Sequence, residues 1–340
     1  MLSSDPPTRR QHGATTFLQL AGWVAGSLAG IVNVMQMSVN IATPVGASPI
    51  DSTVQSLEKA RDEGFRRVWM AQMPFDGDLL TVLAVALREV DGIEVGSAVL
   101  PIQNQHPMQM AQRALTLNTI AGARFVLGLG LTHQAVTEGM WGIPYDKPVR
   151  RMREYLDALQ PLLAGEPVDV VGETVTARGA LQIPGAPAPE IYLAALGPQM
   201  LKLCGRRTAG TLTWMCGPKT LGQHICPTLR AAAEEAGRPV GAVRVVAGLP
   251  ISVTDDVDRA RAQATELFAM YGTLPSYRAM LDREGYANPE DAAIIGNEEE
   301  VSERLDELAS LGVDEFSAVI FDTSPDVRER TRALLRAKDA

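Results

Sequence analysis

Two histidines in this sequence stand beside apolar runs, at positions where an imidazole could take part in proton transfer. His133 ends the run FVLGLGLTH (125–133), and His106 belongs to a His-Pro step. Imidazole changes charge near pH 6.5, so modest changes in its surroundings decide whether it carries a proton at neutral pH. We identify His133 as the first candidate for a proton donor or hydrogen-bond partner. His106 is the second, although a His-Pro step can also simply shape a turn.

The glycines of the same run raise a different interpretation. Gly128-x-Gly130 follows a predicted strand, as the phosphate-binding glycines of dinucleotide-binding folds do. That pattern fails at its third position, where His133 replaces the glycine that lets helix and strand pack closely, and no acidic residue ends a matching second strand. The sequence also contains no Walker A, GxSxG or HExxH motif, so phosphate hydrolysis, an α/β-hydrolase and a zincin are unsupported.

The three cysteines, Cys204, Cys216 and Cys226, include no CxxC pair, which argues against a disulfide framework. Cys216, His224 and Cys226 could be read as metal ligands. A closed zinc site usually needs four ligands at tighter spacing, however. We expect buried or incidental thiols and no bound metal.

The elements that must position these residues follow from an alternation of short apolar runs with longer amphipathic runs. Repeated βα units of this kind build a parallel sheet, and eight strands are the number that closes a barrel. The pattern therefore predicts an α/β fold, a (β/α)8 TIM barrel with insertions, over residues 37–340. The expected strands are Ser38–Ala42, Arg67–Ala71, Ile93–Leu100, Phe125–Leu129, Glu190–Ala194, Gly210–Thr213, Val243–Val253 and Glu315–Ile320.

Apolar residues at helical spacing predict helices at Val54–Glu63, Arg150–Leu163 and Val301–Leu311. Two segments interrupt the alternation. Val168–Ile183 is typical of a small inserted hairpin, with Gly172 at its turn. Met270–Asn297 is a longer excursion, of the kind that often covers the C-terminal mouth of a barrel.

The composition is that of an ordinary globular protein. Of 340 residues, 46% are hydrophobic and 21% are charged, and the formal net charge is −9. A chain with this acidic excess repels phosphate backbones and anionic lipids, because binding to either relies on clustered Lys and Arg. We expect a small-molecule substrate and no nucleic-acid partner.

The first 36 residues stand apart from the predicted barrel. The pair Arg9-Arg10 precedes an uncharged run at 17–35, whose Ala, Gly, Leu and Val content is that of a signal segment. Six residues separate the arginines from this run, whereas a twin-arginine signal has its apolar residues almost directly after the pair. Several glycines also weaken a spanning helix.

We interpret 1–36 as an upstream extension that precedes the true first residue, Met35 or Met37. This interpretation predicts a cytoplasmic protein without membrane contact. A signal or membrane anchor at 17–35, with export, is the alternative.

The segment 96–133 carries a resemblance to a known family. It reads GSAVLPIQNQHPMQMAQRALTLNTIAGARFVLGLGLTH: a strand ending in an apolar-Pro turn, a His-Pro step, a helix ending in Ala and Thr, and an Ala-Arg-Phe strand ending in Leu-Gly-x-Gly. This order resembles that of the luciferase-like oxidoreductases, the bacterial luciferase superfamily. PEIYLAALGPQMLKLCGRRTAG (189–210) is similar to the family's fifth strand and the Gly-Pro that opens the next helix. Ile295-Gly296-Asn297 is a weaker third match, and together the matches extend from Met37 to the end of the chain.

The resemblance implies a site at the C-terminal ends of the strands, where barrel enzymes place their chemistry. In the family, the third strand often carries a bulge with a non-prolyl cis peptide that supports the ring of a flavin or deazaflavin, and Ser97, Ala98 and Val99 occupy that place. The helix that opens at Gly197-Pro198 has free amides suited to the coenzyme's phosphate. The other cofactor-binding candidates stand at or just after predicted strand ends: Thr43, Gln72, Leu131, Thr132, Leu196 and Trp214.

One departure from the family pattern concerns the proton donor. Many deazaflavin-dependent members have Asp-His after the second strand, where this chain has Gln72-Met73. The departure removes an obvious donor. It gives more weight to His133, which stands where other members have Thr-Gly-Glu after the fourth strand.

The resemblance implies an oxidoreductase that transfers a hydride between coenzyme F420 and an unidentified small organic substrate. The Ala-Leu-Gly-Pro and Leu-Gly-Leu-Gly segments look closest to that branch of the family. An FMN-dependent monooxygenase is one alternative, and a non-catalytic barrel that binds a flavin or deazaflavin is another. Such coenzymes supply the chemistry themselves, so the absence of a nucleophilic triad does not argue against an enzyme. The family also implies a homodimer.

Overall fold

The computed structural model describes residues 34–42 and 48–339. By its contacts the chain divides after Asn33, and all the described residues belong to the unit Val34–Ala340. Almost all of the run at 17–35 lies outside the described residues, so the extension, the signal and the anchor stay predictions. Among the residues that are described, no helix is long and apolar enough to cross a membrane.

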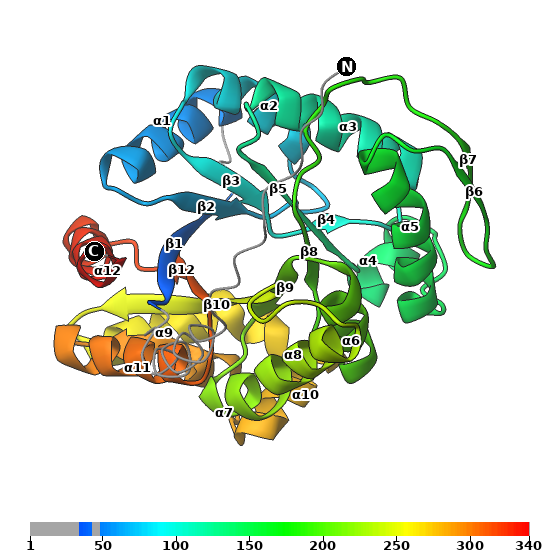
Figure 1. The fold of residues 1–340 in the computed structure, drawn as a ribbon. Helices are drawn as coiled ribbons and strands as arrows, with labels where there is room; N and C mark the ends of the chain where they lie inside the picture. The colour runs from blue at the N-terminus through cyan, green and yellow to red at the C-terminus, as the bar shows by residue number, and fades with distance from the viewer. Residues whose placement is uncertain (1–33, 43–47, 340) are drawn as a thin grey trace, which may run out of the picture. The chain divides into compact units, whose positions relative to one another are not determined.

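Eight parallel strands close into a barrel within the described region, so the predicted fold is confirmed (Figure 1). Each strand pairs with the next, and the last strand, β12, pairs with the first, β1, through Gln36↔Glu315 and the three residue pairs that follow. In order around the barrel the strands are β1 (Gln36–Ile41), β2 (Arg67–Met70), β3 (Glu94–Ser97), β5 (Phe125–Gly130), β8 (Ile191–Ala194), β9 (Gly210–Trp214), β10 (Arg244–Val253) and β12 (Glu315–Ile320).

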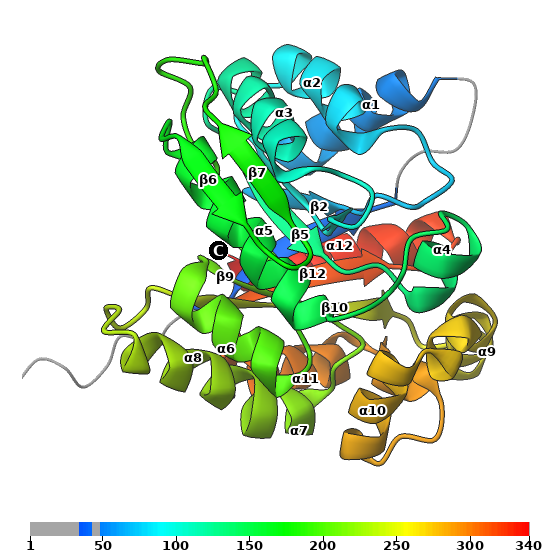
Figure 2. The same ribbon diagram turned by 90° about the vertical axis from the view of Figure 1, so that its right-hand side faces the viewer.

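Helices surround this barrel (Figures 1 and 2). Many of them begin with proline, which lacks the N–H that the first helical residue would leave unbonded. The helical segments are α1 (Pro49–Asp62), α2 (Leu79–Glu89), α3 (Pro107–Ile120), α4 (Gln134–Gly139), α5 (Pro148–Leu163), α6 (Pro198–Arg207), α7 (Pro218–Thr220), η1 (Leu221–Ile225), α8 (Cys226–Glu235), α9 (Val257–Phe268), η2 (Ala269–Thr273), α10 (Pro275–Glu284), η3 (Pro289–Ala292), α11 (Glu298–Ser310) and α12 (Pro325–Asp339).

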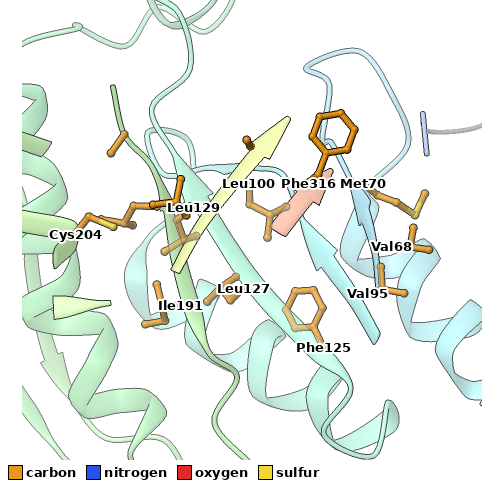
Figure 3. Close-up of a cluster of buried hydrophobic side chains, with 14 of the residues drawn as sticks. Val68, Met70, Val95, Leu100, Phe125, Leu127, Leu129, Ile191, Cys204 and Phe316 are labelled. Atoms are coloured by element: carbon orange, nitrogen blue, oxygen red, sulfur yellow. The ribbon is translucent and has the colours of Figure 1, made fainter. Parts of the chain in front are cut away.

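The strands bury both faces, as strands of a helix-covered barrel must. On β5, Phe125, Leu127 and Leu129 face the helices and belong to the main core, part of which Figure 3 shows. The intervening Val126 faces the barrel interior and packs in a smaller cluster with Trp69 and Tyr192. The continuous apolar runs of the sequence reflect this burial on two sides.

Two predicted boundaries need correction. The strand expected at Ile93–Leu100 is interrupted: β3 ends at Ser97, and a separate short strand, β4 (Leu100–Pro101), pairs with β5. The helix expected at Val54–Glu63 begins five residues earlier, at Pro49, because proline is well suited to the first turn. The other predicted strands and helices agree with the structure to within about two or three residues.

The predicted hairpin is confirmed as β6 (Val168–Val171) and β7 (Thr176–Gly179), with Gly172 in its turn. It lies outside the barrel beside α5 (Figure 2). Glu154 of α5 holds the turn by accepting hydrogen bonds from the backbone amides of residues 173–175. The excursion at Met270–Asn297 contains most of η2, then α10, η3 and a short strand, β11 (Ile294–Gly296), which pairs with the end of β10.

The N-terminal end of the barrel is closed by charged side chains at the starts of strands. Arg67 of β2 donates to Glu94 of β3 at 2.8 Å and to Glu315 of β12 at 2.7 Å. Trp69 donates its indole N–H to the other oxygen of Glu315 at 2.6 Å. Burial opposes ionisation of Arg67, but the two carboxylates outweigh it and raise its pKa. This end of the barrel is an interlocked ion-pair network.

Candidate active site

At the C-terminal end of the barrel, β3 gives way to a bulge held by a buried serine. The Ser97 hydroxyl donates to the Gly128 carbonyl and accepts the Gly128 N–H, both at 2.9 Å. The next peptide bond, Ala98–Val99, is cis, as the family resemblance implied for this position. Ala98 and Val99 are half-buried, in contrast to the fully buried Ser97. The structure thus brings these three candidate residues together at the mouth of the barrel.

The Leu-Gly-x-Gly motif of β5 has a steric explanation beside this bulge. A Cβ at Gly128 would clash with the Ser97 carbonyl, and a Cβ at Gly130 would clash with the Val99 side chain. Neither glycine has the positive φ that would require glycine on backbone grounds. The two glycines therefore let β5 approach the bulge closely, which a phosphate-binding interpretation of this motif would not explain.

His133 lies directly after β5 as the N-terminal cap residue of α4. Its imidazole is half-buried, and its ring centroid lies 5.7 Å from that of Tyr277 on α10. Neither ring nitrogen has a hydrogen-bond partner among the residues that the structure describes. Burial lowers the pKa of His133 below its ordinary value of 6.5, so the imidazole is neutral at pH 7. It is available to accept a proton or to exchange a hydrogen bond with a ligand.

His106, by contrast, has both ring nitrogens engaged. Its Nδ1 accepts the Met108 N–H at 3.2 Å and so caps α3. Its Nε2 lies 2.9 Å from the Thr176 carbonyl on the hairpin, to which it donates when Nδ1 is the acceptor. The side chain is exposed and directed at the hairpin. This geometry favours the structural interpretation of the His-Pro step.

Gln72 organises the loop after β2. Its side-chain oxygen accepts the Leu79 N–H at 2.7 Å, and its amide donates to the Met73 and Gly77 carbonyls. The side chain thus spans the loop between β2 and α2. The resemblance implied that Gln72 contacts the cofactor. The same side chain also holds this loop together, so it would have to do both.

Leu131 and Thr132 continue the chain from β5 to His133 and are half-buried. The Thr132 N–H donates to the side-chain oxygen of the buried Gln103 at 3.3 Å. Thr43 lies outside the described residues, so its role stays a prediction.

Trp214 is the last residue of β9, one residue later than the predicted strand end, and its ring packs against aromatic residues at the end of α9 and in the excursion. Its ring centroid lies 5.9 Å from that of Phe268 and 5.6 Å from that of Tyr271. The indole N–H is buried and makes no hydrogen bond within the described structure. Tyr271 in turn lies 5.2 Å from Tyr277, ring to ring, so the aromatic contacts extend to His133.

Tyr271 and Tyr277 were not among the residues singled out from the sequence. The only available signal was their position in an aromatic-bearing excursion that was expected to cover the mouth. Sequence position alone does not show which face of such a segment points inward.

The Gly197-Pro198 step opens α6, as the sequence indicated. Gly197 is exposed and extended, with φ −79° and ψ 150°, and a Cβ there would meet nothing within 4 Å. No side chain caps the first turn. The preceding Leu196 carbonyl accepts a hydrogen bond from Nε2 of His224 at 2.8 Å, which fixes the end of β8. The uncapped amides of a ten-residue helix, next to open space, suit a phosphate.

The three cysteines are buried, and burial raises their pKa values, to about 11 for Cys204 and Cys226. The sulfurs of Cys216 and Cys226 lie near different backbone carbonyls, those of Trp214 and Gly312. Among the described residues, no group of three or more side chains is arranged to hold a metal ion. Because their pKa values are raised, the three thiols are protonated at neutral pH.

Comparison with known proteins gives three consistent matches. The model of the luciferase-like monooxygenase family matches residues 32–315. A 5,10-methylenetetrahydromethanopterin reductase from Methanolobus tindarius is 29% identical over 252 residues, which cover 74% of this chain and 76% of the relative. The structure of the coenzyme F420 dependent tetrahydromethanopterin reductase from Methanopyrus kandleri has a TM-score of 0.76 and 21% identity over 89% of this chain and 98% of that chain.

A monooxygenase matches almost as well. The oxygenating constituent of 3,6-diketocamphane monooxygenase from Pseudomonas putida, in complex with FMN, has a TM-score of 0.70 and 17% identity over 90% of this chain and 98% of that chain. At these sequence identities the two structures establish the fold alone.

Proposed function

The chain belongs to the luciferase-like monooxygenase family, and we propose that within this family it transfers a hydride between coenzyme F420 and a small organic molecule. Family membership makes the chain an oxidoreductase, which removes the non-catalytic barrel from the alternatives. The observation that carries the proposal is the likeness, over about three quarters of the chain, to a 5,10-methylenetetrahydromethanopterin reductase. A similar structure is that of a tetrahydromethanopterin reductase described as dependent on coenzyme F420.

The mouth of the barrel fits a flat ring that carries polar atoms at its edge. The side chains at the bulge are short: Ala98 and Val99 are half-buried, and Ala194 lies beside Gly130 of β5. Small residues leave room for a planar group to approach the backbone. The buried Trp214 N–H lies close to the Tyr271 hydroxyl but makes no regular hydrogen bond, and buried donors of this kind usually have a partner when the site is filled.

The residues that would hold the coenzyme follow from these features. Ala98 and Val99 would support the ring, and the α6 amides after Gly197 would bind a phosphate. Leu131, Thr132, Leu196 and Trp214 would line the same mouth, while Gln72 would hold the neighbouring loop. F420, when bound, supplies a carbon that accepts or gives a hydride, so the protein needs only to orient it and manage the proton.

His133 is suited to the proton. In its neutral form it accepts the proton that a substrate loses from oxygen or nitrogen as a neighbouring carbon gives up its hydride. In the direction of substrate reduction, the resulting imidazolium returns that proton. Ser97 contributes by fixing the bulge on which the ring would rest, and the aromatic side chains around Trp214 exclude water from it.

Parallel titration of the full chain with F420 and with FMN, followed by fluorescence, tests the cofactor. Tight F420 binding with weak FMN binding supports hydride transfer. The reverse result favours the FMN-dependent monooxygenase, to which the likeness to the FMN-bound structure points. Binding of neither coenzyme contradicts both assignments.

Two further expectations belong to the same proposal. The family resemblance implies a homodimer, which light scattering on the purified protein would measure. A cytoplasmic location follows only if residues 1–36 are an upstream extension, which determination of the N-terminus of the natural protein would decide.

A further inference from the structure

Four side chains form a continuous aromatic surface at the mouth: His133, Trp214, Tyr271 and Tyr277, here called the ring cluster. They come from three different parts of the chain, namely the start of α4, the end of β9 and the excursion. Successive ring centroids are 5.7, 5.2 and 5.6 Å apart from His133 through Tyr277 and Tyr271 to Trp214. All four side chains are half-buried, whereas Phe268, packed behind Trp214, is fully buried.

The ring cluster carries no charge at neutral pH. Burial lowers the pKa of His133 and raises the pKa of both tyrosines, so the imidazole and the two phenols are all neutral. The Tyr271 hydroxyl lies near the Trp214 N–H, which offsets part of the rise in the Tyr271 pKa, and the Tyr277 hydroxyl makes no hydrogen bond to a described residue. The ring cluster therefore presents to a ligand the faces of aromatic rings and a few neutral hydrogen-bonding groups.

Charged side chains close to the ring cluster are committed to their own segments. Arg278, next to Tyr277, donates to Asp282 and to the backbone carbonyls of residues 286 and 287. Glu284 accepts the backbone amides of α7. Asp322, after β12, pairs with Arg259 at 2.9 Å. None of these groups is left without a counter-charge or hydrogen bond, so none would stabilise a charged ligand.

Exposed apolar side chains also occur on segments that lead away from the mouth. Four of the large hydrophobic side chains that are exposed, Phe75, Met140, Leu267 and Met270, lie on segments that follow β2, β5 and β10. Leu267 directly precedes the buried Phe268, and Met270 directly precedes Tyr271. Exposed apolar side chains on several segments next to a site are consistent with a ligand that is itself apolar.

We propose that the mouth takes an uncharged, largely apolar substrate with a flat face, which packs against Tyr277 and Tyr271 beside His133. The inference rests on the proposed function, since it names the substrate class of that same site. Offset or edge-to-face contacts with an aromatic ring favour a flat apolar molecule. A charged group would lose its water here without gaining a partner.

Two fluorescent probes with the same ring system test this class. N-phenyl-1-naphthylamine is neutral, and 8-anilinonaphthalene-1-sulfonate carries one negative charge on the same framework. Both are titrated into the full chain, with F420 binding measured on the same samples. We expect the neutral probe to bind about tenfold more tightly than the sulfonate or better.

Tyr277→Ala should weaken binding of the neutral probe by about three- to tenfold, whereas Tyr277→Phe should retain most of it. Val171→Ser, which removes an exposed apolar side chain from the hairpin, is the control and should leave binding unchanged. Thermal unfolding of each variant establishes that it is folded. If Tyr277→Ala does not fold, Tyr271→Ala serves in its place.

The inference is overturned if the sulfonate binds as tightly as the neutral probe or more tightly. It is also overturned if substitution of Tyr277 or Tyr271 leaves binding of the neutral probe unchanged. If F420 still binds in that case, the proposed function stands without it. If the neutral probe binds through Tyr277 and F420 does not bind, the substrate class stands and the coenzyme assignment fails.

Discussion

The two ends of the barrel differ in how their polar side chains are hydrogen-bonded. At the N-terminal end, Arg67, Glu94 and Glu315 bind one another, and the Trp69 N–H is used by the same network. At the C-terminal end, the imidazole of His133 and the indole N–H of Trp214 have no hydrogen-bond partner in the described structure. At the first end the charged groups pair with one another, although the buried hydroxyl of Tyr192 beside Trp69 makes no hydrogen bond in the described structure. At the second end a histidine and an indole N–H have capacity left for a ligand.

This difference suggests that side chains at the N-terminal end serve mainly stability, and those at the C-terminal end mainly function. Breaking a buried ion pair weakens the compensation of a buried charge, so substitutions in the network should destabilise the protein. Unused donors and acceptors at the mouth contribute little to folding and become useful only when something binds. The division agrees with barrel enzymes generally, in which the C-terminal face carries the chemistry.

The largest effect is expected at the N-terminal end. Glu315→Gln should lower the free energy of unfolding by up to about 3–5 kcal/mol, because it removes the fully buried one of the two carboxylates that pair with Arg67 and leaves only the more exposed Glu94. Denaturant unfolding measures the loss. The matched control is Glu235→Gln, which breaks the exposed pair Arg206–Glu235 and should cost less than about 1 kcal/mol. Equal losses in the two variants would mean that the network is not what stabilises this end.

The mouth should show the reverse behaviour. His133→Gln should reduce kcat by about 100-fold or more if the imidazole carries the proton, while changing the free energy of unfolding by less than about 1.5 kcal/mol. Steady-state turnover with F420 and calorimetry on the same preparation measure both quantities. A variant that keeps full turnover would remove His133 from the chemistry.

The pH dependence gives His133 a second signature. Burial holds its pKa below 6.5, so the neutral base is fully present above that value and is lost as the pH falls through the lowered pKa. Substrate oxidation should therefore decline on the acid side below pH 6.5, and His133→Gln should lack this decline. The same group makes the fold less stable in that window, because the unfolded state binds the proton more readily.

A smaller effect, on stability alone, is expected at the other histidine. His106→Ala removes the α3 cap and the contact with Thr176, and should cost about 1–2 kcal/mol of unfolding free energy with activity unchanged. His106→Asn restores a capping side chain and should recover part of the loss. Loss of turnover in a folded His106→Ala protein would contradict the structural role and bring His106 back as a catalytic candidate.

The sequence was sufficient for the barrel because its signals are local and repeated. The strands that contain Trp69 and Phe125, for example, bury side chains on both faces, and for that reason their sequences are continuous apolar segments. The break in the third strand was harder to place. It depends on how Ser97 binds β5 across the sheet, an interaction between residues 31 apart in sequence.

The site could be predicted only in outline. Strand ends are predictable, so candidate residues at the mouth could be named from the sequence, and their roles stay predictions. The distinction between His133 and His106 did not, because it depends on Thr176 of a hairpin 70 residues away. Tyr277 reaches His133 through an inserted excursion whose packing no periodic pattern encodes.

The smallest effect tests whether the start of α6 belongs to the mouth. Gly197→Ala adds a methyl group into open space, and the backbone there is already in a conformation that alanine adopts. The fold should be unaffected or stabilised by up to about 1 kcal/mol, because alanine restricts the unfolded chain. If the coenzyme's phosphate lies against these amides, the same methyl should weaken F420 binding by about three- to tenfold. Gly139→Ala at the end of α4 also adds a methyl to open space and is the control. Unchanged F420 affinity in Gly197→Ala would place the phosphate elsewhere.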